Sequence, residues 1–221
     1  MIVDTEAAFI TEAVRQTFVA AGATWPPEAG PVPLDSIIGA FNLAHDEVSG
    51  LTRAVAAAYL ARWNIERPEL LRDGTTPLAG FLFANADGGY ILVRRDDQLP
   101  RRRFSAAHEL GHYRLHFRPA SFDVPEAACI LMDDGLEKIR DHDGDNSDQQ
   151  QMSLAEMERQ ANRFAAELLM PENLCRSLWE HYAKRFGPTA RFIVHHLASD
   201  LLVSREAARW RLRQLGLIPP E

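Results

Sequence analysis

Apolar residues at helical spacing divide the first third of the chain into three predicted helices. Residues 4–21 place apolar side chains every three or four positions, which indicates an amphipathic helix. A second helix is predicted over residues 34–44. A third is predicted from Asp46, a residue type that often caps helices, to Tyr59. The Gly- and Pro-rich residues 22–33 are typical of a linker.

Two short apolar runs follow, residues 79–84 and 90–94, with turn formers between them. This pattern predicts a β-hairpin with a five-residue loop. Because a lone hairpin is marginally stable, we expect it to belong to a small sheet packed on helices. Either strand is a candidate edge for pairing with an extended peptide.

The segment 104–117 combines helical periodicity with the motif His-Glu-Leu-Gly-His at residues 108–112. Residues four apart share one helix face, so His108 and His112 can bind one divalent ion. Zinc favours nitrogen donors in a tetrahedral shell and keeps one position for water in catalytic sites. Glu109 lies beside this pair, where its carboxylate can take a proton from that water.

Two further residues of the segment constrain the site. Gly111 disfavours the helix by about 1 kcal/mol relative to Ala, which indicates that another segment approaches closely there. His116 is a poor third ligand, because eight residues of helix separate it from His108 by about 12 Å. We therefore expect the third ligand elsewhere in the chain.

A second strongly periodic helix, predicted over residues 154–170, offers that ligand. Glu158 and Asn162 lie four residues apart on a flank of its apolar stripe. Glu158 is a candidate ligand, and Glu156 and Glu167 compete with it on spacing alone. Asn162, one turn further on, is a candidate to orient a metal-bound histidine through a hydrogen bond.

Residues 102–116 and 158–171 together resemble the two motifs of the ImmA/IrrE family of zinc metallopeptidases, and the likeness extends over roughly residues 75–217. The resemblance implies an α+β fold with a zincin-like core. In such a core, a small antiparallel or mixed sheet packs on the HExxH helix and on a second ligand helix. Mainly helical segments would precede and follow it.

The resemblance also implies a gluzincin-like site. His108, His112 and Glu158 would bind Zn²⁺, and Glu109 would be the catalytic base. Members of the family typically cleave a helix-turn-helix repressor and so release genes in stress or mobile-element responses. The expected function is therefore that of a zinc endopeptidase with a protein substrate and a role in transcription regulation.

We expect three parts along the chain. Residues 1–73 form an N-terminal helical segment, residues 74–188 the metallopeptidase core, and residues 189–221 a C-terminal helix pair like a helix-turn-helix. The interval between the two motifs is longer than the resemblance implies. Its charged and Gln-rich part, about 133–151, is predicted to be a mobile insert.

Two other functions compete with peptide hydrolysis. A DNA-binding regulator is suggested by four arginines on the last helix: Arg205, Arg209, Arg211 and Arg213. A net charge of −7 argues against it, because phosphate binding draws on surplus Lys and Arg. The other alternative is a zinc-containing protein-binding or toxin–antitoxin-type component without peptidase activity, against which the intact Glu109 argues.

The remaining expectations concern the transition state and the compartment. Tyr182, His181 and His195 are candidate donors to a developing oxyanion, although residues of these types are more often ordinary surface or hydrogen-bonded side chains. The chain has two cysteines, no apolar run of membrane length and no signal-like start. We therefore expect a cytoplasmic protein without a membrane partner.

Overall fold

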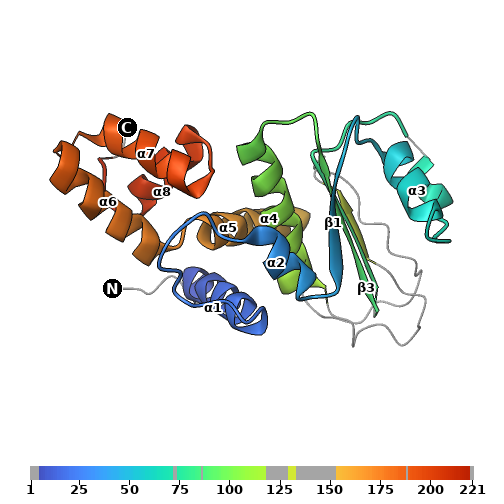
Figure 1. Cartoon of the computed structure of the whole chain (residues 1–221). Coiled ribbons are helices and arrows are strands. Elements are labelled where there is room, and N and C mark those ends of the chain that lie inside the picture. The colour runs from blue at the N-terminus through green and yellow to red at the C-terminus, as the bar shows by residue number, and fades with distance from the viewer. Residues whose placement is uncertain are drawn as a thin grey trace.

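The computed structural model describes residues 5–71, 74–85, 87–117, 129–132, 153–187 and 189–219 (Figure 1). The helices are α1 (Thr5–Ala20), α2 (Leu34–Gly39), α3 (Arg53–Ala61), α4 (Leu99–His116), α5 (Leu154–Leu169), α6 (Glu172–Phe186), α7 (Ala190–Leu201) and α8 (Arg205–Gln214), with a 3-10 helix η1 (Pro68–Leu71). The strands are β1 (Leu43–Val48), β2 (Gly80–Asn85), β3 (Gly88–Arg94) and β4 (Cys129–Met132). The fold is thus mixed α+β, and the insert predicted at about 133–151 lies outside the described residues.

The described strands form one mixed sheet in the order β1-β3-β2-β4. β2 pairs antiparallel with β3, which confirms the predicted hairpin, and β4 pairs antiparallel with β2. β1 joins the other side of β3 in parallel. The prediction that residues 79–84 or 90–94 form an edge is wrong, because β2 and β3 each pair on both sides. The edges of the described sheet are β1 and β4.

Both faces of the hairpin are covered, which explains its continuous apolar runs. Successive side chains of a strand point to opposite faces. Phe81 and Phe83 pack in one apolar cluster with residues of α3, while Leu82 and Ala84 pack in the other with residues of α4 and α5. The sheet therefore lies between α3 on one side and α4 on the other (Figure 1).

Two of the predicted helices in the N-terminal part are wrong in their extent. α2 ends at Gly39, and Asn42 takes a left-handed φ of 56°, after which residues 43–48 form β1. Asp46 lies inside this strand and accepts a hydrogen bond from Tyr59 instead of capping a helix. α3 begins at Arg53, where the Thr52 side chain accepts from the backbone N–H of Val55.

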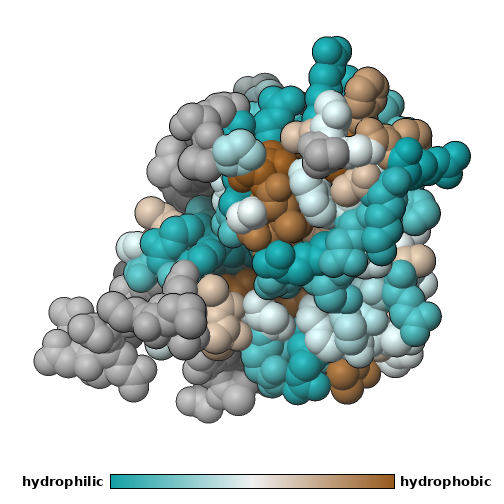
Figure 2. All heavy atoms as spheres, turned by 90° about the vertical axis from the view of Figure 1, so that its left-hand side faces the viewer, coloured by the Kyte–Doolittle hydropathy of each residue, from teal (hydrophilic) through white to brown (hydrophobic). Residues whose placement is uncertain are grey.

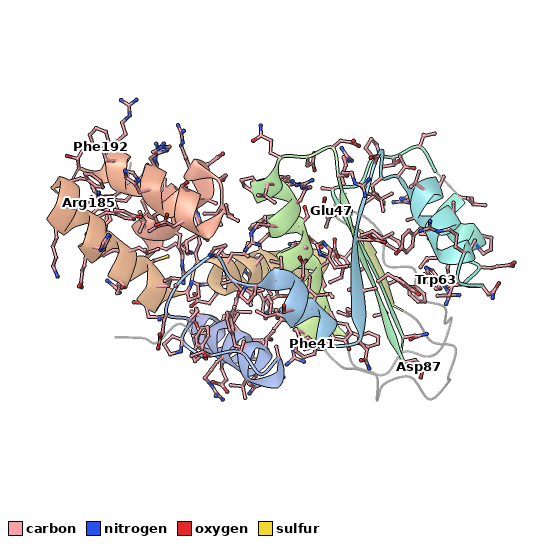
Figure 3. All side chains as sticks on the ribbon, viewed as in Figure 1. Phe41, Glu47, Trp63, Asp87, Arg185 and Phe192 are labelled. Atoms are coloured by element: carbon pink, nitrogen blue, oxygen red, sulfur yellow. The ribbon has the colours of Figure 1, made fainter. Side chains whose placement is uncertain are left out.

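The C-terminal part contains one helix that the sequence did not predict, α6, ahead of the predicted pair. The pair itself is present as α7 and α8, and the Ser204 side chain caps α8 by accepting from the backbone N–H of Ala207. The face of the molecule formed by the C-terminal helices is mostly hydrophilic or near neutral, with apolar side chains in several small areas (Figure 2). Phe192 and Arg185 point outward from the end of this region furthest from the sheet (Figure 3).

The division of the chain at residues 73 and 188 stays a prediction. The structure adds that β1, from the predicted N-terminal segment, is hydrogen-bonded to β3 of the predicted core. In the parts of the chain that the structure describes, no helix has the length and apolar character needed to cross a bilayer.

α4 and α5 pack closely at Gly111. A side-chain Cβ at this position would lie 3.1 Å from Phe164 Cδ1 and 3.2 Å from the backbone oxygen of Ala161. The predicted close approach of a second segment at Gly111 is confirmed, and that segment is α5.

Replacing Gly111 with Val should therefore destabilise the fold. Overpacking of a tight contact typically costs about 1–3 kcal/mol, and urea unfolding followed by circular dichroism measures the change. The matched control is Gly39→Val, because nothing lies within 4 Å of a Cβ at Gly39. Equal unfolding midpoints for Gly111→Val and the unmodified chain would contradict the close packing.

Candidate metal centre

Three side chains from two helices converge at the α4–α5 contact. His108 and His112 come from α4 and Glu158 from α5. His108 Nε2 lies 3.2 Å from one carboxylate oxygen of Glu158, and His112 Nε2 lies 3.1 Å from the other. The two Nε2 atoms are 3.0 Å apart. We call these three residues the metal group.

The spacing of these atoms fits a metal ion. Ligands bound tetrahedrally to one zinc at about 2.0–2.1 Å lie roughly 3.3 Å from one another. One nitrogen or oxygen atom from each of the three residues lies within 4.8 Å of the other two. Two imidazoles and a carboxylate are also the donor types that zinc accepts in catalytic sites.

The electrostatics of Glu158 support the charged form of its carboxylate. Burial by itself raises the pKa of this group, but hydrogen bonds with His108 and His112 outweigh burial. The pKa of Glu158 is therefore held well below its usual range. A carboxylate that stays ionised is a competent metal ligand at neutral pH.

Each histidine of the metal group has a partner at its other ring nitrogen. His108 Nδ1 lies 3.1 Å from Asn162 Oδ1, the contact that the sequence suggested. His112 Nδ1 lies 3.0 Å from His116 Nδ1, and His116 Nε2 lies 3.2 Å from Gln160 Oε1. The sequence indicated only that His116 is a poor ligand, not that it contacts His112. Its spacing of four residues from His112 was the available signal for this contact.

Glu109 lies next to the metal group on α4 and is completely buried. Its side chain packs against Gly80 at the start of β2. A Cβ at Gly80 would lie 3.1 Å from Glu109 Cγ and 3.2 Å from Cδ. The strand therefore approaches Glu109 more closely than a residue with a side chain allows, and no sequence pattern pointed to Gly80.

The structure separates Glu158 from its two competitors. Glu167 forms a buried ion pair with Arg211 of α8. Glu156 lies in the first turn of α5, where its backbone N–H donates to the capping side chain of Ser153. Of the three, Glu158 is the one that meets the histidines.

The three candidate oxyanion donors lie in α6 and α7 and are not members of the metal group. Tyr182 donates to Asp200, and this hydrogen bond together with burial raises the pKa of Tyr182 to about 12. His181 packs edge-on against Tyr182 with ring centroids 5.0 Å apart. His195 is exposed beside His196.

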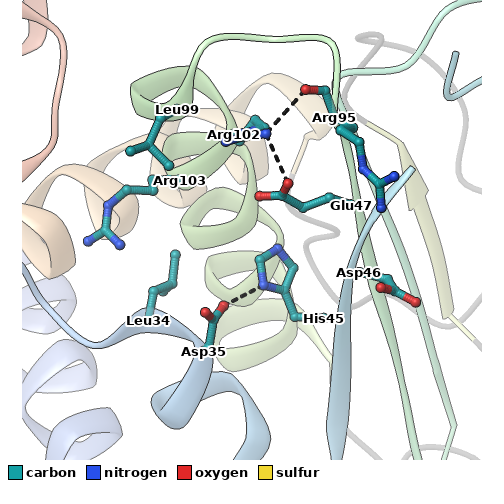
Figure 4. Close-up of a pocket in the computed structure, with 9 residues that line it drawn as sticks. All are labelled: Leu34, Asp35, His45, Asp46, Glu47, Arg95, Leu99, Arg102 and Arg103. Atoms are coloured by element: carbon teal, nitrogen blue, oxygen red, sulfur yellow. Dashed lines mark hydrogen bonds and ion pairs between the residues drawn. The ribbon is translucent and has the colours of Figure 1, made fainter. Parts of the chain in front are cut away.

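A separate pocket of about 320 Å³ lies between α2, β1 and the start of α4 (Figure 4). Charged residues that pair with one another line it. His45 Nδ1 lies 2.6 Å from Asp35, and Arg102 donates to Glu47 at 2.9 Å. None of the metal group lines this pocket.

Comparison with known proteins gives the family. Residues 70–213 match the IrrE N-terminal-like domain of the M78 peptidases. One relative is Metallopeptidase ImmA of Bacillus subtilis (strain 168), which is 25% identical over 111 residues. That match covers 50% of this chain and 53% of the relative, so the chain spans about half of the relative's length. Because the family match covers more than half of the chain and includes both halves of the metal group, this protein belongs to the ImmA/IrrE family of metallopeptidases.

Proposed function

We propose that the chain is a zinc-dependent endopeptidase with a zincin-like core. The convergence of His108, His112 and Glu158, with Glu109 buried beside them, is the observation that carries the proposal. The arrangement of the helices supports it, because α4 packs on the sheet and α5 packs on α4. Family membership supports a metal-dependent peptidase, and the donor set supports zinc.

In this proposal the residues of α4 and α5 have three different roles in peptide hydrolysis. His108, His112 and Glu158 would hold zinc, which when bound supplies a Lewis acid that polarises the peptide carbonyl and acidifies water. Glu109 would accept the proton of the attacking water and pass it to the leaving amine. Asn162 would accept a hydrogen bond from His108 Nδ1 and so fix the ring with Nε2 toward the metal.

The substrate would lie extended along the outer edge of β4. β4 pairs directly with β2, and its residue Met132 lies opposite Phe81, next to the Gly80 that contacts Glu109. β1, the other edge of the described sheet, is separated from β2 by β3. Backbone hydrogen bonds to an edge strand bind a peptide with little dependence on its sequence.

We further propose a helix-turn-helix repressor as the substrate and the cytoplasm as the site of action, in a stress or mobile-element response. The substrate proposal rests on the family resemblance. The compartment rests on the chain's two cysteines, which suit a reducing environment.

Zinc binding should require residues from both helices. The metal-free chain should take up one zinc ion, and His112→Ala or Glu158→Gln should each reduce its affinity at least tenfold, as isothermal titration measures. Glu156→Gln is the matched control, since this residue lies on the same helix outside the metal group. Wild-type affinity in Glu158→Gln would contradict the role of Glu158.

Peptide hydrolysis should require Glu109. Incubation with a helix-turn-helix repressor encoded beside this chain should yield two fragments, and a chelator should stop the cleavage. Glu109→Gln should keep zinc and lose about 10²–10⁴-fold in rate, the usual contribution of a general base. Cleavage at the wild-type rate by Glu109→Gln would contradict the proposed role of Glu109 as the general base. Zinc without any cleavage would favour a protein-binding component instead.

Adding one methyl group at Gly80 should displace the Glu109 carboxylate. Gly80→Ala should keep its zinc and lose on the order of 10²-fold in cleavage rate, the effect of misplacing a catalytic group by about 1 Å. The control is Gly39→Ala, where the added methyl group enters open space. An unchanged rate in Gly80→Ala would show that Glu109 tolerates this shift.

A further inference from the structure

His116 lies between a proposed metal ligand and a residue of the neighbouring helix. It follows His112 by one turn of α4, and the two Nδ1 atoms are 3.0 Å apart. Its other nitrogen, Nε2, lies 3.2 Å from Oε1 of Gln160 on α5. Gln160 is 8% exposed and His112 is 2% exposed, and His116 between them is half-buried.

The direction of these hydrogen bonds follows from the chemistry of the amide oxygen. An amide oxygen only accepts, so His116 must carry its hydrogen on Nε2 and donate it to Gln160. In the neutral ring Nδ1 is then an acceptor. His112 can meet that acceptor only by carrying its own hydrogen on Nδ1. This leaves His112 Nε2 with a lone pair, facing Glu158 and His108.

The opposite tautomers lose the hydrogen bond to Gln160 and the lone pair that a metal ion needs. A hydrogen on His116 Nδ1 would leave a lone pair on its Nε2, facing the Gln160 oxygen. It would also place the hydrogen of His112 on Nε2, where it can donate to the Glu158 carboxylate but leaves no lone pair for a metal ion. A buried polar atom left without a hydrogen-bond partner disfavours the state that contains it.

We infer that Gln160 and His116 are positioning residues that hold His112 in its metal-binding tautomer. The inference rests on the proposed metal site. Asn162 does the same for His108 by direct contact. α5 thus supplies the carboxylate of the metal group and, directly or through His116, an amide oxygen for each histidine.

Gln160→Met tests this inference, because it removes the acceptor and keeps the length of the side chain. The dissociation constant for zinc, measured by competition with a chromophoric chelator, should rise about 10–100-fold. In the metal-free chain, long-range nitrogen–proton NMR should show a population of His112 with its hydrogen on Nδ1. Gln160→Met should reduce this population in favour of Nε2, where the Glu158 carboxylate accepts the hydrogen. Gln16→Met on α1 is the matched control.

Two more variants separate the hydrogen bond from packing. Gln160→Glu keeps an acceptor oxygen and should restore the tautomer of His112. His116→Asn places an amide oxygen near the former Nδ1, so His112 should no longer depend on Gln160. Adding Gln160→Met to His116→Asn should then change zinc affinity less than twofold. Should Gln160→Met fail to fold, His116→Leu compared with His116→Asn makes the same test.

The outcomes distinguish this inference from the proposed function. If Gln160→Met binds zinc like the wild type and keeps the His112 tautomer, the inference is overturned. If the wild-type chain binds no zinc but shows the Nδ1–H tautomer, lost in Gln160→Met, the tautomer control is supported and the zinc peptidase is overturned.

Discussion

The close packing of α4 against α5 is the contact on which the metal group depends. Two members of the metal group come from one helix and the third from the other, more than forty residues later in the chain. Their atoms meet at 3.1–3.2 Å only because the helix backbones approach closely at Gly111 and Ala161. The same contact brings the side chain of Asn162 to Nδ1 of His108 and the side chain of Gln160 to Nε2 of His116. The close approach of α4 and α5 therefore determines both the packing of the two helices and the arrangement of the polar side chains between them.

This geometry places polar groups where burial opposes folding. Of nine buried polar or charged residues in the described part of the chain, four belong to the site: His108, Glu109, His112 and Gln160. Buried polar groups destabilise a fold unless they find partners. Here the partners include a carboxylate, two amide oxygens and a further imidazole. A bound cation would complete this set, so we expect metal binding and folding to be coupled.

The sequence predicted those parts of the molecule that depend on local spacing. Helical periodicity located α4 and α5, and the four-residue spacings within them indicated His108 with His112 and offered Glu158 with Asn162 as candidates. The sequence did not predict those parts whose secondary structure or partner is determined by contacts between distant segments. Leu43–Val48 carries apolar residues that fit a helix, but parallel pairing with β3 makes it a strand. The competitors of Glu158 were separated only by their partners, such as Arg211 for Glu167, which lie far away in sequence. The need for glycine at position 80 likewise becomes visible only in the structure, where Gly80 packs against Glu109.

The parallel pairing of β1 has a consequence for the boundaries of the domain. The family match begins at residue 70, whereas β1 ends at Val48. A fragment trimmed to the matched region would uncover one side of β3 along its Tyr-Ile-Leu-Val stretch. Exposed apolar edges of this kind pair with other chains and aggregate. Residues 43–48 are thus structurally part of the sheet on which α4 packs, even though they lie outside the region of the family match.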